Sequence, residues 1–270
     1  MMASHMLTLT RELRIGLHET SEASAPPNSA NGFAANPPLL GIAPFLLLRA
    51  SLIGPIDPST GMLINIKIVD RVLREQAVPL IRRAYYHNDL PLTLTTYEIF
   101  ALLSESFSPH TLAAITLAPS PFLWCTVDHK EPLMIKTSQR FEFSAAHRLH
   151  AGSLSDSQNQ EIFGRCNNPN GHGHNYEVEV TLAGTPDPAS GNLIPGGVLQ
   201  LQQIVNHHIL DRFDHKHLNL DCEEFKTLNP TVENIAKTIY QKLRPAIPAP
   251  AKLHCIKVWE TPKTVAEYSE

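Results

Sequence analysis

Histidines that could bind a metal are concentrated in one part of this 270-residue chain, between residues 147 and 217. His172 and His174 are two residues apart and lead into a predicted strand at 175–182. Side chains alternate between the two faces of a strand, so these two imidazoles would point to the same side. His147, from a neighbouring strand, would complete a set of three nitrogen ligands. Three imidazoles with an open fourth position are typical of a catalytic zinc site.

The surroundings of the His-x-His pair favour a site, although such a pair alone would more often be incidental in a chain with fourteen histidines. Cys166 lies six residues before His172, in a loop rich in turn-forming residues, and Asp214 and His215 follow a predicted helix. These are the parts of a thiolate base, because imidazole lowers a thiol pKa and carboxylate orients the imidazole. Glu260 interrupts an apolar strand, where a buried carboxylate would need a partner such as the N–H edge of a heterocycle.

An internal repeat indicates which elements position these groups. Residues 49–64 align without a gap on residues 179–194, and seven of the sixteen positions are identical. Both stretches predict an alternating strand, a D-P-x-x-G turn and another strand, because Asp caps the turn, Pro fixes φ and Gly accepts a positive φ. The likeness continues through two pairs of predicted helices, 66–84 with 198–212 and 96–107 with 231–243.

The chain is therefore predicted to contain two copies of one unit, residues 7–128 and 134–270. Each copy has the order strand, strand, helix, helix, strand, strand. A stretch at 19–38 is rich in Ser, Ala, Pro and Asn, and it is predicted to be a flexible surface insertion rather than a binding segment.

The first copy lacks most of the chemical groups of the second. Residues that cannot replace the histidine pair, Asp214 and Glu260 stand in their aligned places, namely Ile42, Pro44, Tyr86 and Pro119. His87, Thr96 and Glu98 remain, and His18 lies near the place of His147. One imidazole cannot make this metal site, so the first copy is predicted to be non-catalytic. Its Thr-x-Glu pattern is interpreted as a helix cap rather than a ligand contact.

Composition limits the partners. The formal charge is −4 and no Lys/Arg-rich run occurs, which argues against nucleic acid. No apolar run approaches the roughly 18–20 residues of a membrane span. The four cysteines are far apart, without a C-x-x-C pair or a signal peptide, so a reducing, cytoplasmic location is expected.

Several motifs together resemble the 6-pyruvoyl-tetrahydropterin synthase family over about residues 137–270. They include F-S-A-A-H-R-L (143–149), F-G-x-C-N-N-P-N-G-H-G-H-N-Y (163–176), D-H-K-x-L-N (214–219), P-T-x-E-N (230–234) and W-E-T (259–261). The six residues from the cysteine to the first histidine are similar to the biopterin-pathway type. Queuosine-pathway 6-carboxytetrahydropterin synthases usually have a shorter interval.

The resemblance implies an α+β tandem tunnelling fold (T-fold). Each unit would be a four-stranded antiparallel sheet with two helices on one face, and the sheets of several subunits would join into barrels. It implies one zinc ion per chain, in the second unit, on His147, His172 and His174. Cys166 would be the general base with Asp214 and His215 as its partners, and the pterin would be held by Glu260, Thr231 and Glu233.

The implied reaction converts 7,8-dihydroneopterin triphosphate into 6-pyruvoyl-tetrahydropterin with loss of triphosphate. The pocket would lie between subunits of a homotrimer or larger homo-oligomer. Two alternatives remain open: a 6-carboxytetrahydropterin synthase in deazapurine synthesis, and a non-enzymatic zinc- or pterin-binding protein.

Overall fold

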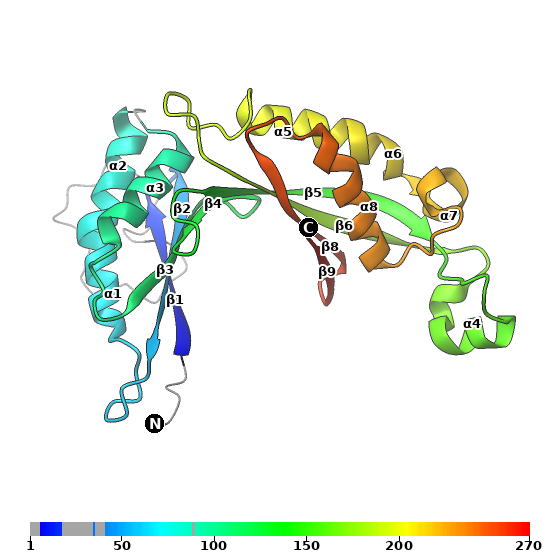
Figure 1. Ribbon diagram of the computed structural model, residues 1–270, viewed down its shortest axis with the longest axis horizontal. Coiled ribbons are helices and arrows are strands. Elements are labelled where there is room, and N and C mark those ends of the chain that lie inside the picture. Colours follow the sequence, from blue (N-terminus) through cyan, green and yellow to red (C-terminus); the bar gives the residue numbers. More distant parts are fainter. Residues whose placement is uncertain (1–5, 18–34, 36–40, 88–89) are drawn as a thin grey trace. The chain divides into compact units, whose positions relative to one another are not determined.

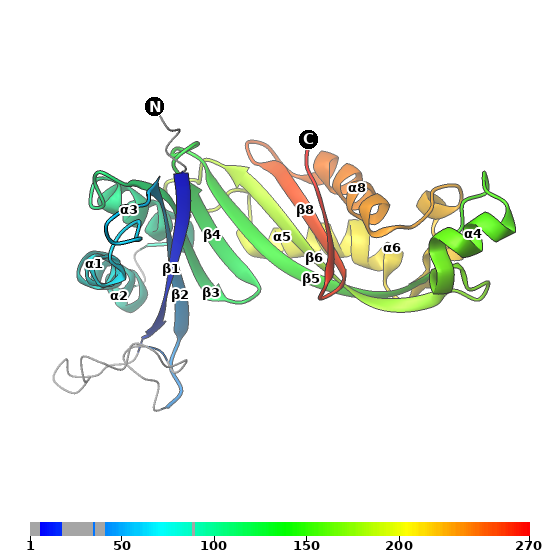
Figure 2. The same ribbon diagram turned by 90° about the horizontal axis from the view of Figure 1, so that it is seen from below.

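The computed structural model describes residues 6–17, 35, 41–87 and 90–270 (Figures 1 and 2). The chain divides into two compact units: Met1–Thr137 with Thr185–Gly191, and Ser138–Gly184 with Asn192–Glu270. Apart from Ala35, the insertion predicted at 19–38 lies outside the described residues. Among the described helices, none has the length and hydrophobicity that crossing a membrane requires.

The first unit is an antiparallel sheet with helices on one face (Figure 1). Its strands are neighbours in chain order: β1 (Met6–Gly16), β2 (Phe45–Pro55), β3 (Thr111–Ser120) and β4 (Leu123–Asp128). One long helical stretch comprises α1 (Ile66–Val72), the π-helical segment η2 (Leu73–Ala77) and α2 (Val78–His87), and α3 (Leu92–Leu103) follows it. Apolar side chains from both layers, such as Leu48, Ile99 and Ile115, are completely buried between them.

The second unit has the same order of main elements. Its strands lie in the order β5 (Ile135–His147), β6 (His172–Gly184), β8 (Lys252–Thr261) and β9 (Thr264–Tyr268), and the two-residue β7 (Lys216–His217) pairs in parallel with β5. The helices on one face are α5 (Gly197–Val205), the π-helical η4 (Asn206–Leu210), α6 (Asp211–Phe213) and α8 (Val232–Leu243) (Figure 1). Shorter elements connect them: α4 (Asp156–Phe163), η3 (Gly164–Asn167), α7 (Leu218–Asp221), η5 (Glu223–Phe225) and η6 (Arg244–Ala246). The predicted α+β class is confirmed.

Helix α8 shows how the sequence forms these elements. The Thr231 hydroxyl accepts a hydrogen bond from the backbone of Asn234 at 3.4 Å, and Glu233 lies at the positive end of the helix. Ile235, Ile239 and Leu243 recur at a spacing of four residues and are completely buried. The sequence therefore fixes both the start of α8 and the face that packs on the sheet.

The structure corrects two predictions: the strand after each D-P-x-x-G turn and the first residue of α3. Both D-P-x-x-G turns form, with Gly61 at φ 69° and Gly191 at φ 70°. The strand expected after each turn is wrong, because Asn65 caps α1 and the positive-φ residues Gly196 and Gly197 lead into α5. Likewise, α3 begins at Leu92 instead of Thr96.

Thr96 is therefore not a helix cap. It lies inside α3, where its hydroxyl donates to the carbonyl of Leu92 at 2.7 Å. The cap position is taken by Pro91, whose fixed φ suits the start of a helix.

The two units share irregular details as well as regular ones. The pairing of β2 with β3 shifts register between Ser51 and Leu52, and that of β6 with β8 shifts between Thr181 and Leu182. These residue pairs are equivalent in the gap-free alignment of 49–64 with 179–194. Each unit also has a π-helical segment in its first long helix. Bulges and π segments are local departures from regular pairing, so finding both in both units supports a common architecture.

Candidate functional site

The three candidate metal ligands lie on two strands of the second unit. On β6, His172 and His174 alternate with the exposed Gly173 and Asn175, so the two imidazoles point to one face. On β5, the same alternation ends at His147, which is completely buried. Strand geometry therefore brings together three side chains that are up to 27 residues apart in sequence.

The distances between these rings suit a single metal ion. The ligand nitrogens of His147, His172 and His174 all lie within 4.8 Å of one another, and no other such group of three occurs among the described residues. The Nε2 atoms of His147 and His172 are 3.1 Å apart. Two imidazole nitrogens on one tetrahedral zinc, each at about 2.0–2.1 Å, would be about 3.3 Å apart. The cluster could therefore hold a metal without rearrangement of this pair.

Hydrogen bonding supplies a second test of the fit. The Nδ1 of His147 lies 2.7 Å from the carbonyl oxygen of Pro230, which can only accept, so Nδ1 carries the proton. The lone pair of His147 is then on Nε2, which faces the cluster. The Nε2 of His174 is buried without a hydrogen-bond partner in the described part of the chain. A bound cation would satisfy both atoms, so these residues fit a metal.

Burial favours the neutral form of His147 and His172, which is the form that binds metals. It lowers the pKa of His147 to about 4, although the hydrogen bond to Pro230 acts in the opposite direction. Burial also lowers the pKa of His172, and repulsion from His174 adds to that effect. Neutral imidazole ligands are therefore available at neutral pH.

Glu260 lies beside the histidine cluster. Its Oε1 is 3.3 Å from Nε2 of His147 and 3.6 Å from Nε2 of His174, and its side chain is 20% exposed. The structure thus places this carboxylate next to the three imidazoles, and open enough for a ligand to reach it.

Asp214 and His215 form a pair, and both residues are hydrogen-bonded to Ser144 on β5. The backbone N–H of Ser144 donates to Oδ1 of Asp214 at 2.8 Å, and this bond is the main reason that the pKa of Asp214 is lowered. The other oxygen, Oδ2, lies 2.8 Å from Nδ1 of His215. His215 has a positive φ of 56°, and its backbone N–H donates to Ser144 at 2.6 Å. Its imidazole is 83% exposed, so Nε2 remains available to a reactant.

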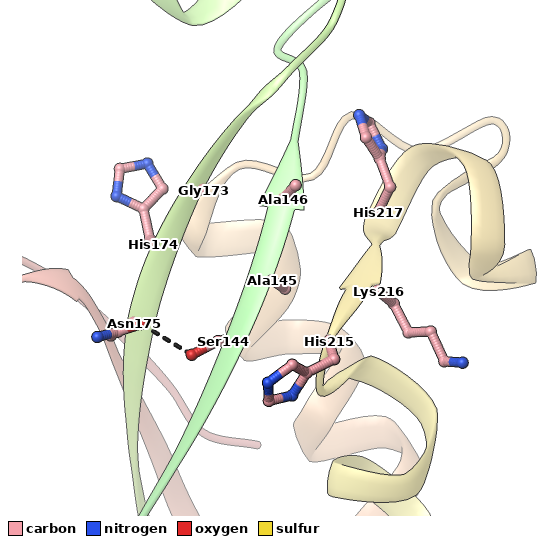
Figure 3. Close-up of a pocket in the computed structure, with 9 residues that line it drawn as sticks. All are labelled: Ser144, Ala145, Ala146, Gly173, His174, Asn175, His215, Lys216 and His217. Carbon is pink, nitrogen blue, oxygen red and sulfur yellow. Dashed lines mark hydrogen bonds between the residues drawn. The ribbon is translucent and has the colours of Figure 1, made fainter.

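An open pocket of about 590 Å³ is lined by His215 and by one of the three candidate metal ligands, His174. His174 and His215 both line it, with the β5 residues Ser144, Ala145 and Ala146 between them (Figure 3). The hollow exists partly because Gly173 has no side chain. The volume lies within the range of small-molecule sites, about 300–1,000 Å³.

Cys166 is not brought to Asp214 and His215 within this chain. It lies on η3, partly exposed, and its carbonyl accepts from Leu149 at 2.8 Å. It does not line the pocket of His215, and no hydrogen bond of its thiol occurs among the described residues.

The two predicted pterin contacts beside α8 differ in exposure. The hydroxyl of Thr231 is used as the helix cap, whereas Glu233 is exposed in the first turn. The carbonyl of Pro230, one residue before Thr231, is the acceptor that holds His147. This helix start is therefore adjacent to the metal cluster.

The part of the chain that contains this site matches a known protein family. A model of the family described as 6-pyruvoyl tetrahydropterin synthase matches residues 136–270. The 6-pyruvoyl tetrahydrobiopterin synthase of Drosophila melanogaster is 40% identical over 139 residues, which are 52% of this chain and 81% of the fly protein. The chain belongs to the 6-pyruvoyl tetrahydropterin synthase family. The resemblance predicted from the motifs is confirmed.

Two further proteins also match about half of this chain. The human 6-pyruvoyl tetrahydrobiopterin synthase is 41% identical over 133 residues, which are 49% of this chain and 90% of the human protein. A solved structure of Caenorhabditis elegans 6-pyruvoyl tetrahydropterin synthase is 41% identical and covers 51% of this chain and 96% of its own, with a TM-score of 0.48.

The structure places two further residues, Tyr176 and Asn219, near the site, and the sequence alone did not single out either of them. Tyr176 lies two residues after His174 on the same face of β6, a spacing that could have placed it in the site. Asn219 accepts from the backbone N–H of Arg148 at 2.8 Å and donates to its carbonyl at 3.0 Å, which fixes the chain just after His147. No spacing rule relates Asn219 to Arg148, so only the structure shows this contact.

The first unit has no equivalent cluster in the described residues. Ile42 is fully exposed, and Pro44 precedes β2. His87 is at the end of α2, and His18 lies outside the described residues. The family match, from residue 136 onward, likewise omits this unit's helices and strands.

Proposed function

We propose that this chain is a zinc-dependent lyase that converts 7,8-dihydroneopterin triphosphate into 6-pyruvoyl-tetrahydropterin with loss of triphosphate. The observation that carries this proposal is the cluster of His147, His172 and His174, whose ligand nitrogens lie within 4.8 Å of one another in the part of the chain matched by the family. The fly and human relatives are named for the corresponding synthase. No observation favours the 6-carboxytetrahydropterin alternative or a role limited to zinc or pterin binding.

The three histidines would hold one zinc ion per chain. Zinc bound there supplies Lewis acidity toward the hydroxyls of the pterin side chain and toward the negative charge that develops on them. The protein's part is to present three imidazoles in a fixed arrangement. The hydrogen bond from His147 to Pro230 fixes the tautomer, and burial keeps the ring neutral.

Cys166, Asp214 and His215 would move protons. A thiolate at Cys166 would remove a carbon-bound proton, and His215 would return one while Asp214 orients its ring. The 2.8 Å contact between Asp214 and His215 supports this pairing. Because Cys166 does not meet His215 within the chain, we infer that the thiol of one copy acts with the imidazole of another.

Glu260 would bind the pterin ring. A carboxylate can accept two N–H groups from the edge of a pterin, and the Glu260 side chain is partly exposed beside the cluster. Thr231 and Glu233 would add contacts from the start of α8. Glu233 would do so through its exposed carboxylate. The hydroxyl of Thr231 already accepts a hydrogen bond as the helix cap, so Thr231 would contribute its remaining hydrogen-bonding groups.

The architecture would be a tandem tunnelling fold, with a non-catalytic unit at 7–128 and a catalytic unit at 134–270. The shared element order, bulge positions and π segments support this duplication. Three two-unit chains would supply six units, enough for two stacked three-unit barrels, so a homotrimer or larger homo-oligomer is expected. Light scattering that gave a monomer would contradict this assembly.

Product analysis tests the proposed reaction. The purified protein is incubated with 7,8-dihydroneopterin triphosphate, and mass spectrometry is expected to detect 6-pyruvoyl-tetrahydropterin and free triphosphate. His174→Ala should abolish turnover, whereas His207→Ala should not, because His207 is 79% exposed and outside the cluster. Release of acetaldehyde with a 6-carboxy product would instead establish the alternative reaction.

A further inference from the structure

Tyr176 is a buried polar residue that the proposed function does not use. Its side chain is completely buried, and burial of a phenol hydroxyl is unfavourable unless a hydrogen-bond partner is present. Among the described residues, the only hydrogen-bond partner of this hydroxyl is Nδ1 of His147, at 3.4 Å. The hydroxyl therefore meets the ring of a proposed metal ligand and no other group.

The strand geometry directs Tyr176 to this place. It follows His174 by two residues on the same face of β6, and its ring lies 5.6 Å from that of His174. On the neighbouring strand, Phe143 precedes His147 by four residues, also on the same face. The rings of Phe143 and Tyr176 are stacked at 5.0 Å with an interplanar angle of 17°. Tyr176 thus contacts two of the three imidazoles and is itself stacked on Phe143.

Two oxygen atoms lie within hydrogen-bonding distance of Nδ1 of His147. The proton on Nδ1 is donated to the carbonyl of Pro230 at 2.7 Å, and the oxygen of Tyr176 is a second, longer acceptor. The Tyr176 ring stands at 89° to the imidazole, with the centroids 6.1 Å apart. Rotation of the imidazole would break the bond to Pro230 and separate Nδ1 from the phenol oxygen, so both contacts keep Nε2 directed at the cluster.

We propose that Tyr176 is a positioning residue that holds His147 in the orientation needed to bind the metal. This inference rests on the proposed zinc centre, but it assigns a role to a residue that neither binds the ion nor touches the reactants. It predicts that the hydroxyl of Tyr176 matters for metal affinity, beyond any contribution to folding.

The chain offers a matched control in Tyr240. This tyrosine is also buried in the second unit, at 2% exposure, and its hydroxyl makes a single hydrogen bond of similar length, to the carbonyl of Leu253 at 3.3 Å. It is remote from the histidine cluster in its contacts. Tyr176→Phe and Tyr240→Phe each remove one buried hydroxyl without changing the ring, so their effects on folding should be comparable.

The experiment measures zinc affinity of the full chain by competition with a chelator, and the visible absorption of the Co²⁺-substituted protein. Tyr176→Phe is expected to weaken zinc binding by about 10-fold or more, as for other residues that orient a ligand, and to alter the Co²⁺ bands. Tyr240→Phe is expected to match the wild type in both. Equal affinity and identical spectra for Tyr176→Phe and wild type would overturn the proposal.

A second variant keeps the inference testable if Tyr176→Phe does not fold. Phe143→Leu removes the ring on which Tyr176 stacks and leaves every polar atom in place, and it should weaken zinc binding by a smaller factor. Unchanged affinity in this variant would also contradict the proposal. Failure of the zinc centre itself is distinguishable, because wild-type protein would then bind neither Zn²⁺ nor Co²⁺ at the histidines.

Discussion

The two units of this chain have the same order of main elements, but only the second carries a metal-binding cluster in the described residues. Both units have a register shift at the aligned strand position and a π segment in the first long helix. At the places of His172 and His174, however, the first unit has Ile42 and Pro44. The two units therefore share an order of elements but not the metal-binding residues, which agrees with the rule that a fold does not by itself determine a site.

The comparison also shows what the site adds to the scaffold. The aliphatic core is common to both units, since Leu48 aligns with Val178 and both side chains are completely buried. What the second unit adds is Tyr176, stacked on Phe143, with its ring against those of His147 and His174. A polar cluster in a buried place needs such specific support, because each nitrogen without a partner is unfavourable there.

The largest expected effect comes from removing a metal ligand in one unit but not the other. His172→Ala should lower kcat/KM by at least about 10³-fold, because the stabilisation of developing charge is lost with the metal. His87→Ala in the first unit should leave kcat/KM unchanged, because His87 is exposed at the end of α2. Steady-state kinetics of both variants provide the measurement. Comparable losses in the two variants would show that the first unit takes part in catalysis.

A smaller loss of activity is expected when Cys166 is changed to alanine, with Cys125→Ala as the control. Cys166→Ala should lower kcat by about 10²-fold or more, the usual contribution of a general base. Cys125→Ala should not, because burial raises the pKa of the Cys125 thiol to about 12 and so keeps it protonated. Single-turnover rates with the pterin substrate distinguish these outcomes. Full activity of Cys166→Ala would remove the proposed role of the thiolate.

The smallest effect concerns the two matched turns, which differ in their surroundings. Gly61 and Gly191 both have a positive φ, so alanine at either position should lower the free energy of unfolding by about 1–2 kcal/mol. An added Cβ at Gly61 meets no atom within 4 Å, whereas at Gly191 it would lie 2.5 Å from Cβ of Pro91, within the first compact unit.

Gly191→Ala should therefore be more destabilising than Gly61→Ala, by about 1–3 kcal/mol of overpacking. Urea unfolding of the full chain, followed by circular dichroism, gives the difference. Equal destabilisation would mean that Pro91 moves aside without an energetic penalty.

The sequence predicted those parts of the fold that depend on local rules. The D-P-x-x-G turns, the cap at Thr231 and the alternation around His172 and His174 all follow from spacing within a few residues. The features that differ from the prediction depend on nearby residues that begin a helix. Pro91 is the N-cap of α3, which begins at Leu92, four residues before Thr96, and Asn65 caps α1 where the repeat predicts a strand.

In the site, too, the sequence predicts the features that depend on local spacing and misses those that depend on distant residues. The metal ligands could be predicted because strand periodicity and family motifs both indicate them. The partners of His147 could not, because Pro230 and Tyr176 are 83 and 29 residues away along the chain. Such contacts depend on how α8 and β6 pack against β5, which no local pattern specifies. Cys166 and His215 are a further case, since both were predicted but do not meet within one chain.

Metal content tests the central claim most directly, because the comparison of the two units requires a metal centre in the second alone. Elemental analysis of the purified wild-type chain should give one zinc per chain, and a variant with His147, His172 and His174 all changed to alanine should give none. A wild-type protein without zinc, or one whose zinc remains in the triple variant, would contradict this account.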